Sequence, residues 1–375
     1  MTKGRIQRAP RNTGSSEREI DRTIAEMRKQ YGDASVIEGG AVTQPDRVST
    51  GIFIFDFLTL GGIPMSRASM VVGERHAGKS VFACLTAAGA QRAYPDKQVA
   101  YIDVEGTFDP VWAGKLGVNT DQLVLFQPET GESAADVTDA LIGTKEVSMV
   151  IMDSVAALVP MKEIDSSAED ALVGVQARLV GGMVRKATAS MIRERKRKHD
   201  VSLLFVNQFR SKIGGFAGFG EPRSIPGGRA LEFCTSMQLI MKNKENTGKD
   251  GYGNDTMTVN EHSFTITKNK LNGGGRAGEF RLLRQDNPDL GLREGEVDDA
   301  STMIAYAKKF GAYGGGGSSW KLEFWDYDLK FRGLGEAVTY LYENREVYWA
   351  LRNYLIASQA NALGMPDYFI ERFLP

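Results

Sequence analysis

The feature that most constrains this chain is the run Gly73-Glu74-Arg75-His76-Ala77-Gly78-Lys79-Ser80, which follows an apolar stretch and opens a helical one. The run matches the pattern G-x-x-x-x-G-K-[ST] in the strand-to-helix context that this pattern requires. Its glycines let the backbone curl so that N–H groups face phosphate oxygens, and the dipole of the following helix favours an anion. We therefore expect ATP at this loop, with Lys79 reaching the β- and γ-phosphates and the Ser80 hydroxyl binding Mg²⁺.

Short apolar runs alternate with helical stretches over the middle of the chain. Such runs are typical of strands buried on both faces of a parallel sheet, and the alternation indicates an α/β fold with a mostly parallel, twisted sheet. The expected strands are Ala68–Val72, Val99–Val104, Leu123–Phe126, Met149–Met152 and Leu203–Val206, and the expected helices include Ser80–Ala93, Ser133–Ile142 and Val173–Arg197. Three later runs are expected to extend the sheet in antiparallel fashion, namely Met237–Met241, Ser263–Lys268 and Glu279–Leu283.

Smaller parts are expected on both sides of a core that we place at residues 46–285. Residues 1–45 contain a basic arm and a helix from Ser16 to Tyr31, whose apolar stripe includes Ile20, Ile24 and Met27. That stripe can pack on this chain's own core or on a neighbouring subunit. The polar stretch Asp286–Asp299 predicts a linker, and residues 286–375 predict a small α/β domain with a glycine-rich turn at Gly314–Gly317.

Polar residues follow three of the expected strands, at the sheet edge where parallel sheets bind their ligands. Asp153 ends one apolar run and is the candidate second ligand of Mg²⁺. Glu105 follows another and is either the base that orients the attacking water or an acid in a polar turn. Gln208 follows a third, where an amide can sense the γ-phosphate by hydrogen bonding.

A glycine-rich stretch runs from Phe209 to Gly228, directly after this amide. Its basic residues are Arg210, Lys212 and Arg223. The stretch is either a loop that holds a polyanion and is ordered by the state of ATP, or a flexible surface loop. Because the net charge of the whole chain is −1, binding to DNA can be predicted only from local basic clusters such as this one.

Composition excludes several other classes of protein. Two cysteines in 375 residues indicate no disulfide framework, and the three histidines do not cluster at metal-ligand spacing, so we expect no zinc site. No apolar run approaches the roughly 18–20 residues of a membrane span, and the basic start lacks the apolar segment of a secretory signal. We therefore expect a cytoplasmic protein without a membrane partner.

Several separate stretches resemble bacterial RecA recombinases and their phage-encoded relatives, from about Ile24 into the C-terminal domain. They are Ser49-Thr50-Gly51, Leu60–Met65, Asp103–Glu105 with Asp109-Pro110, Lys115–Val118, Gln127–Glu132, Asp153–Leu158, Asn207-Gln208, Lys212–Gly214 and Gly227-Gly228. The resemblance implies a DNA-dependent ATPase with a RecA-like P-loop core, an N-terminal oligomerisation helix and a small C-terminal domain. Proteins of this family form homo-oligomeric helical filaments on single-stranded DNA and exchange strands with double-stranded DNA in repair and recombination.

The resemblance also implies roles around the nucleotide at matching positions. Glu105 is implied to activate the attacking water, and Asp109 and Trp112 to contact and stack the adenine. Gln208 is implied as the relay between nucleotide and DNA. Lys268 and Lys270 match lysines that reach ATP bound on the neighbouring subunit, so they are implied to act in catalysis there.

Further roles implied by the resemblance concern DNA and the neighbouring subunit. Met161–Ala171 and Phe209–Pro226 match two DNA-binding loops, while Phe233 and the early helix match the subunit interface. The residues implied to bind DNA are Arg178, Arg185, Arg210, Lys212, Ile213, Gly227, Gly228 and Arg229.

The chain departs from the family pattern at several positions. Trp112 stands for the usual tyrosine, Gly106 for a common histidine, Arg229 for an asparagine and Glu232 for a basic residue. The chain ends at Pro375 without the family's acidic tail, which puts the restraint of DNA access by that tail in doubt. Two other hypotheses remain: a ring-forming RecA-fold motor such as a helicase, and a paralogue that only modulates a recombinase.

Overall fold

The computed structural model describes residues 19–33, 36, 39, 43–166, 174–211, 223–249 and 255–375. The chain divides into two compact units, Met1–Gln44 and Pro45–Pro375. The described helix of the first unit is α1 (Glu19–Tyr31), which has acidic residues in its first turn and basic residues in its last, as the helix dipole favours. Ser16, the predicted start of this helix, lies outside the described residues.

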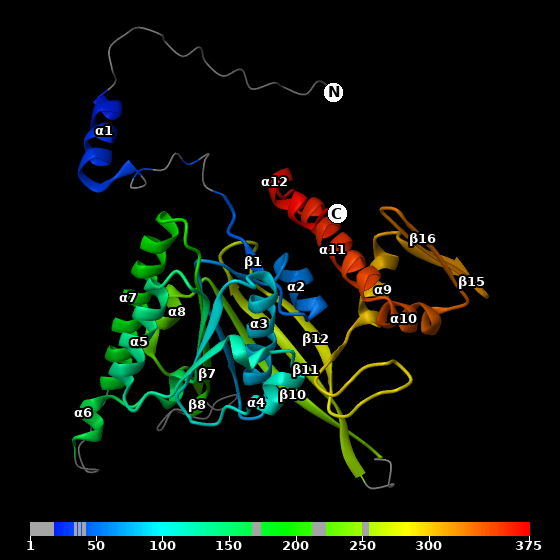
Figure 1. Ribbon diagram of the computed structural model, residues 1–375, viewed down its shortest axis with the longest axis horizontal. Helices are drawn as coiled ribbons and strands as arrows, with labels where there is room; N and C mark the ends of the chain where they lie inside the picture. The colour runs from blue at the N-terminus through cyan, green and yellow to red at the C-terminus, as the bar shows by residue number, and fades with distance from the viewer. Residues whose placement is uncertain are drawn as a thin grey trace. The chain divides into compact units, whose positions relative to one another are not determined.

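A nine-stranded sheet forms the centre of the second unit (Figure 1). Its strands in spatial order are β13 (Val297–Asp298), β12 (Arg276–Leu283), β11 (Asp255–Asn269), β10 (Met237–Lys249), β3 (Ala68–Gly73), β7 (Ser202–Gln208), β6 (Val147–Asp153), β4 (Gln98–Asp103) and β5 (Leu123–Phe126). Neighbouring strands are parallel from β10 to β5, whereas β10, β11, β12 and β13 pair antiparallel. The predicted α/β fold with a mostly parallel sheet is confirmed.

Two expectations about individual strands are wrong. Met237–Met241 does not extend the sheet antiparallel, because β10 pairs parallel with β3 and the direction reverses only at β11. β5 is not buried on both faces, since it is the edge strand beside β4 and leaves Val124 and Leu125 exposed by 41% and 43%. An apolar run alone does not distinguish an edge strand from a central one.

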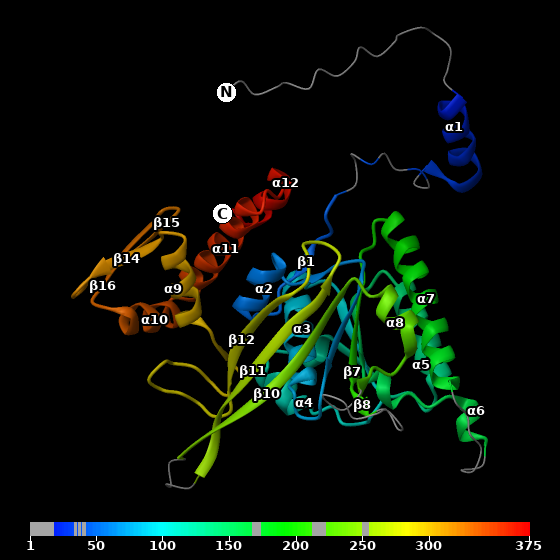
Figure 2. The same cartoon turned by 180° about the vertical axis from the view of Figure 1, so that it is seen from behind.

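The two faces of the sheet carry separate cores, because successive side chains of a strand point to opposite faces. In β6, Met149 and Ile151 join one core while Val150 and Met152 join the other. The first core includes α2 (Phe53–Thr59) and α3 (Lys79–Ala93), and the second includes α5 (Gly131–Gly143), α7 (Val175–Lys196) and α8 (Gly228–Cys234) (Figure 2). The remaining short elements here are α4 (Pro110–Lys115), α6 (Met161–Ile164), β1 (Arg47–Val48), β2 (Ile63–Pro64), β8 (Arg210–Ser211) and β9 (Arg223–Ser224).

The C-terminal part packs α9 (Ala300–Lys309), α10 (Leu334–Glu343), α11 (Arg345–Ala362) and α12 (Asp367–Ile370) with a second, antiparallel sheet. Its strands are β14 (Tyr313–Gly316), β15 (Ser319–Phe324) and β16 (Tyr327–Phe331), so the predicted glycine-rich turn is mostly strand. The predicted linker ends on the core, where β13 pairs with β12 and the buried Asp299 accepts hydrogen bonds from Phe53 N and Tyr348 Oη. Among the described helices, none is both long and apolar enough to cross a membrane.

Candidate functional site

The predicted phosphate loop connects β3 to α3 and passes very close to other parts of the chain. A side chain at Gly73 would collide with the backbone carbonyl of Met241. A side chain at Gly78, where φ is +85°, would collide with the ring of His262. The two glycines of the sequence pattern are therefore required by the curl of the loop and by the close approach of Met241 and His262.

Lys79 is folded back over this loop. Its Nζ donates a hydrogen bond of 2.6 Å to the carbonyl oxygen of Glu74. Burial lowers the pKa of Lys79, and the nearby carboxylates of Asp153 and Glu105 oppose that shift. The ammonium of Lys79 thus lies at the start of α3, beside the loop. A phosphate bound there would replace the carbonyl of Glu74 as the hydrogen-bond partner of the ammonium.

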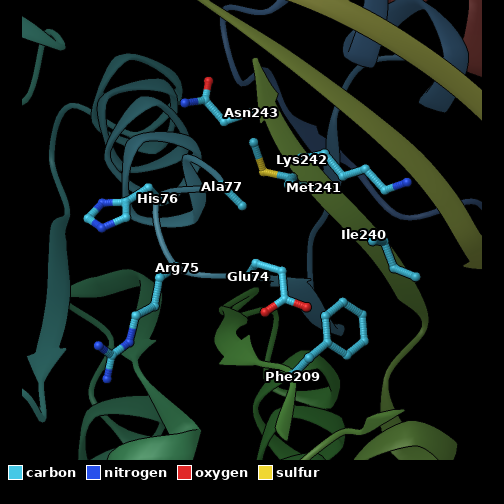
Figure 3. Close-up of a pocket in the computed structure, with 9 residues that line it drawn as sticks. All are labelled: Glu74, Arg75, His76, Ala77, Phe209, Ile240, Met241, Lys242 and Asn243. Atoms are coloured by element: carbon cyan, nitrogen blue, oxygen red, sulfur yellow. The ribbon is translucent and has the colours of Figure 1, made fainter. Parts of the chain in front are cut away.

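The middle of the loop forms one wall of a cavity of about 870 Å³ (Figure 3). Arg75 and His76 are exposed on this wall, while Ala77 is buried. Residues Ile240–Asn243 in the first half of β10 form the opposite wall, and Phe209 lies directly after the last residue of β7. Of the predicted ATP-binding loop, Glu74–Ala77 line this cavity, whereas Gly78, Lys79 and Ser80 line a second cavity of about 370 Å³ beside the start of α3.

Ser80 and Asp153, the two predicted ligands of Mg²⁺, lie together. Ser80 Oγ donates a 2.7 Å hydrogen bond to Asp153 Oδ2, and Tyr101 Oη donates another of 2.7 Å to the same oxygen. Burial raises the pKa of Asp153, while the two hydroxyl donors oppose the shift. Sequence reasoning missed Tyr101, since a tyrosine within an apolar strand carries no signal of a site.

Glu105 projects from a turn that follows β4. Asp103 fixes this turn by accepting hydrogen bonds from the backbone N–H groups of Thr107 and Phe108. Ser154 Oγ donates to Glu105 Oε1 at 2.6 Å, and Gln208 Nε2 donates to the same oxygen at 3.0 Å. The predicted base and the predicted relay are therefore joined directly. Ser154 was not among the predicted site residues, although it follows Asp153 in the chain.

Gln208 and Arg210 share a cavity of about 750 Å³ with Glu74 and Glu105. Arg210 Nη2 donates a 2.6 Å hydrogen bond to the carbonyl of Ala156, so the start of the predicted DNA-binding loop is tied to the segment after β6. Asn207 Nδ2 ties the far end of the same loop by a 2.9 Å bond to Pro226 O.

The predicted DNA-binding residues fall into two described groups. Arg210, Gly227 and Gly228 line one cavity of about 850 Å³. Arg178 and Arg185 are exposed on α7, two turns apart on one face, and Arg229 is exposed on α8, which packs against α7. Lys212 and Ile213 lie outside the described residues, and so does the last part of the first predicted loop, residues 167–171.

Lys268 and Lys270 lie at the end of β11 and hold the end of α8. Lys268 Nζ donates to Glu232 O, and Lys270 Nζ donates to Phe233 O at 3.0 Å. Burial and the neighbouring charge of Lys270 lower the pKa of Lys268. Phe233 itself is 70% exposed, so these lysines and the predicted interface aromatic share one surface.

The predicted adenine contacts lie at α4. Asp109 caps this helix, accepting hydrogen bonds from the N–H groups of Val111 at 2.8 Å and Trp112 at 3.1 Å. The guanidinium of Arg284 lies over the Trp112 ring, 4.4 Å from its centroid. The indole is therefore held flat against a cation on one side, a contact that the sequence did not predict.

The apolar stripe of the predicted interface helix is exposed or partly exposed among the residues that the structure describes. Ile20 is 56% exposed, and Ile24 and Met27 are partly exposed. None of the residues of α1 is buried in the described structure.

Comparisons of this chain with known proteins place its sequence in one family. Residues 18–286 match the family model described as RecA N-terminal domain. The chain is 34% identical over 337 residues to Protein RecA of Clostridium perfringens (strain SM101 / Type A), covering 89% of each chain. It is 36% identical over 298 residues to Protein RecA of Bacillus licheniformis, covering 78% of this chain and 81% of that protein. The crystal structure of the RadB recombinase matches with 20% identity and a TM-score of 0.46, over 63% of this chain and 96% of that one.

Proposed function

This chain belongs to the RecA family and is a RecA-type recombinase, and we propose that it hydrolyses ATP between neighbouring protomers of a filament on single-stranded DNA. In that filament it pairs the bound strand with a homologous duplex and exchanges strands. Membership of the family implies a DNA-dependent ATPase. The residues around the phosphate loop are suited to bind the phosphates, to bind Mg²⁺ and to activate water.

The phosphates of ATP would lie on the backbone N–H groups of Gly73–Ser80, with Lys79 exchanging Glu74 O for a phosphate oxygen. Ser80 and Asp153 fit Mg²⁺, because a hydroxyl and a carboxylate oxygen 2.7 Å apart are hard ligands suited to this ion. When bound, the ion neutralises charge on the phosphates. The hydrogen bond from the hydroxyl of Tyr101 would hold the Asp153 carboxylate in the orientation that binds the ion.

One observation carries the coupling of ATP to DNA: Glu105 Oε1 accepts hydrogen bonds from both Ser154 and Gln208. Glu105 orients the attacking water, and Gln208 begins the segment that leads to Arg210 and the second predicted DNA-binding loop. A γ-phosphate that competes for the Gln208 amide shifts this segment, so that DNA binding and hydrolysis affect each other. Arg178, Arg185 and Arg229 would follow the DNA backbone.

The position of Lys268 and Lys270 supports an active site shared between protomers. Lys268 pairs with Gln238 near the start of β10, and both lysines reach the end of α8, whereas the phosphate loop leaves the opposite end of the strands. In its own chain the pair therefore points away from the nucleotide. These two cations, which lie beside the exposed Phe233, are instead suited to contact ATP that is bound to a neighbouring protomer.

The proposal is tested by measuring ATP hydrolysis while single-stranded DNA is titrated into the purified protein. We expect strong stimulation that saturates at a few nucleotides per protomer, together with particles whose length grows with the DNA. Lys79→Ala should abolish the stimulated rate because phosphate binding is lost. Particles of one fixed size would contradict the filament and favour a ring motor, and full activity of Lys79→Ala would contradict the assignment of the loop.

A further inference from the structure

Gln176, in the first turn of α7, holds the segment that follows β6. This segment is the one-turn helix η4 (Val155–Ala157), which ends at Leu158. Gln176 Nε2 donates a hydrogen bond of 2.8 Å to the carbonyl oxygen of Leu158. The same nitrogen lies 3.2 Å from Ala156 O and 3.4 Å from Val155 O, so one amide faces three carbonyls of a single turn.

The end of η4 needs such donors, because the last carbonyls of a helix have no partner within it. Val155, Ala156 and Leu158 are 0%, 7% and 2% exposed, and a buried carbonyl without a donor is costly. Arg210, at the start of the second predicted DNA-binding loop, is another donor, since its Nη2 lies 2.6 Å from Ala156 O. Side chains from α7 and from this loop therefore meet on the carbonyls of η4.

The segment that is held in this way leads directly to Glu105. Ser154 is buried, precedes η4 and accepts a 3.1 Å hydrogen bond from Ala157 N, so it belongs to the same turn. Its Oγ donates to Glu105 Oε1 at 2.6 Å. A displacement of η4 therefore changes the position of a hydroxyl that orients the proposed base. Gln208 reaches the same oxygen from the end of β7, by a different part of the chain.

The start of α7 also lies close to residues that are predicted to bind DNA. Arg178 follows Gln176 by two residues and is exposed. Val180, farther along the same helix, joins the same core as Val155. Gly227, directly after the second predicted loop, is so close that a Cβ there would lie 2.8 Å from Val180 and 3.4 Å from Val155. Because closely packed interiors transmit displacements, a movement of α7 or of this loop on binding DNA would reach η4.

We propose that Gln176 is a positioning residue for Glu105, and that it carries changes at the start of α7 to the Ser154 hydroxyl when DNA binds. This route is separate from the one through Gln208. The inference rests on the proposed function, because it requires ATP hydrolysis that responds to DNA. Since the Gln176 amide is engaged with the carbonyls of η4, its loss should lower the turnover number rather than the affinity for ATP or for single-stranded DNA.

The first test compares the wild-type chain with Gln176→Met, which keeps the length of the side chain but removes the donor. On saturating single-stranded DNA, kcat for ATP should fall by roughly two- to tenfold, the value of one hydrogen bond between neutral groups. KM for ATP and the affinity for a fluorescent oligonucleotide should stay within about twofold of the wild-type values. Gln176→Lys restores a donor of similar reach and should regain most of the lost turnover. Gln359→Met, at a partly exposed glutamine of α11, should leave turnover unchanged.

A double-mutant cycle distinguishes this role from a purely structural one. If Gln176 acts through the Ser154 hydroxyl, adding Gln176→Met to Ser154→Ala should lower turnover further by less than about twofold, because that hydroxyl is already absent. Added to Gln208→Ala, the same change should lower turnover at least as much as in the wild-type chain. Among the described residues, Ser154 is then the remaining donor to Glu105 Oε1.

Three results would overturn the inference: an unchanged turnover of Gln176→Met, an effect of equal size with and without the Ser154 hydroxyl, or a matching loss of DNA affinity. Thermal unfolding shows whether Gln176→Met is folded. Gln176→Glu, which has the same length and also lacks the donor, takes its place in the cycle if it is not. If the wild-type chain shows no hydrolysis that DNA stimulates, the proposed function itself fails, whereas stimulated hydrolysis with an additive cycle contradicts this inference alone.

Discussion

At Glu105, one carboxylate oxygen accepts hydrogen bonds from two side chains of the candidate site. Among the described residues, Ser154 and Gln208 both donate to Oε1, so the proposed attacking water would be met by Oε2. Glu105→Gln removes the base but keeps the size of the side chain and leaves Lys79 and Ser80 in place. We expect ATP hydrolysis to fall by about 10²–10⁴-fold while ATP binding is retained, as measured by steady-state turnover and equilibrium binding.

The matched control for this prediction is Ser154→Ala, which removes one hydrogen bond to the same oxygen and keeps the carboxylate. Its turnover should fall by roughly tenfold to a hundredfold, the value of one hydrogen bond to a charged group, and by less than that of Glu105→Gln because Gln208 still donates to the same oxygen. A Glu105→Gln protein that hydrolyses ATP at the wild-type rate would show that another group activates the water.

At the scale of elements, a buried ion pair ties α11 to α2. Arg352 Nη2 lies 2.6 Å from Asp56 Oδ2, with both side chains buried. Removing one partner of such a pair leaves an uncompensated charge and typically costs about 3–5 kcal/mol. Because Ser49 and Thr50 continue to donate to Asp56, Arg352→Met should lower the free energy of unfolding by about 3 kcal/mol, measured by urea denaturation.

The same helix offers a control in Arg345, whose Nη2 lies 3.5 Å from Glu296 Oε1 and whose side chain is half-exposed. Because exposed pairs contribute little, Arg345→Met should cost less than about 1 kcal/mol. Equal losses in the two variants would mean that the Asp56 pair does not hold α11 in place.

Periodic patterns in the sequence predict the central elements well and the contacts between them poorly. The phosphate loop and the strand that ends at Asp153 follow from local spacing, because a glycine pattern and an apolar run are properties of neighbouring residues. Tyr101 and Ser154 were missed, since the partner of each is distant in the sequence. The strand β14 was missed because its glycines carry no side chains whose alternation would indicate a strand.

At the scale of the whole molecule, the proposed active site would be assembled from the two opposite ends of the sheet of neighbouring copies. The phosphate loop and Glu105 follow the carboxyl ends of β3 and β4, while Lys268 and Lys270 hold the carbonyls at the end of α8, beside the exposed Phe233. A head-to-tail contact between copies brings unlike surfaces together and continues into a filament when it does not close. Each copy would then supply the loop to one site and the lysines to the next.

This arrangement predicts that two inactive variants restore activity when mixed. Glu105→Gln lacks the base, and the double variant Lys268→Ala with Lys270→Ala lacks the cations, so each alone should hydrolyse little ATP on single-stranded DNA. In a random 1:1 filament, about one contact in four joins an intact Glu105 to intact lysines, so about a quarter of the wild-type rate should return. If both groups served the site of their own chain, no contact would be complete, and the mixture would stay as inactive as its components.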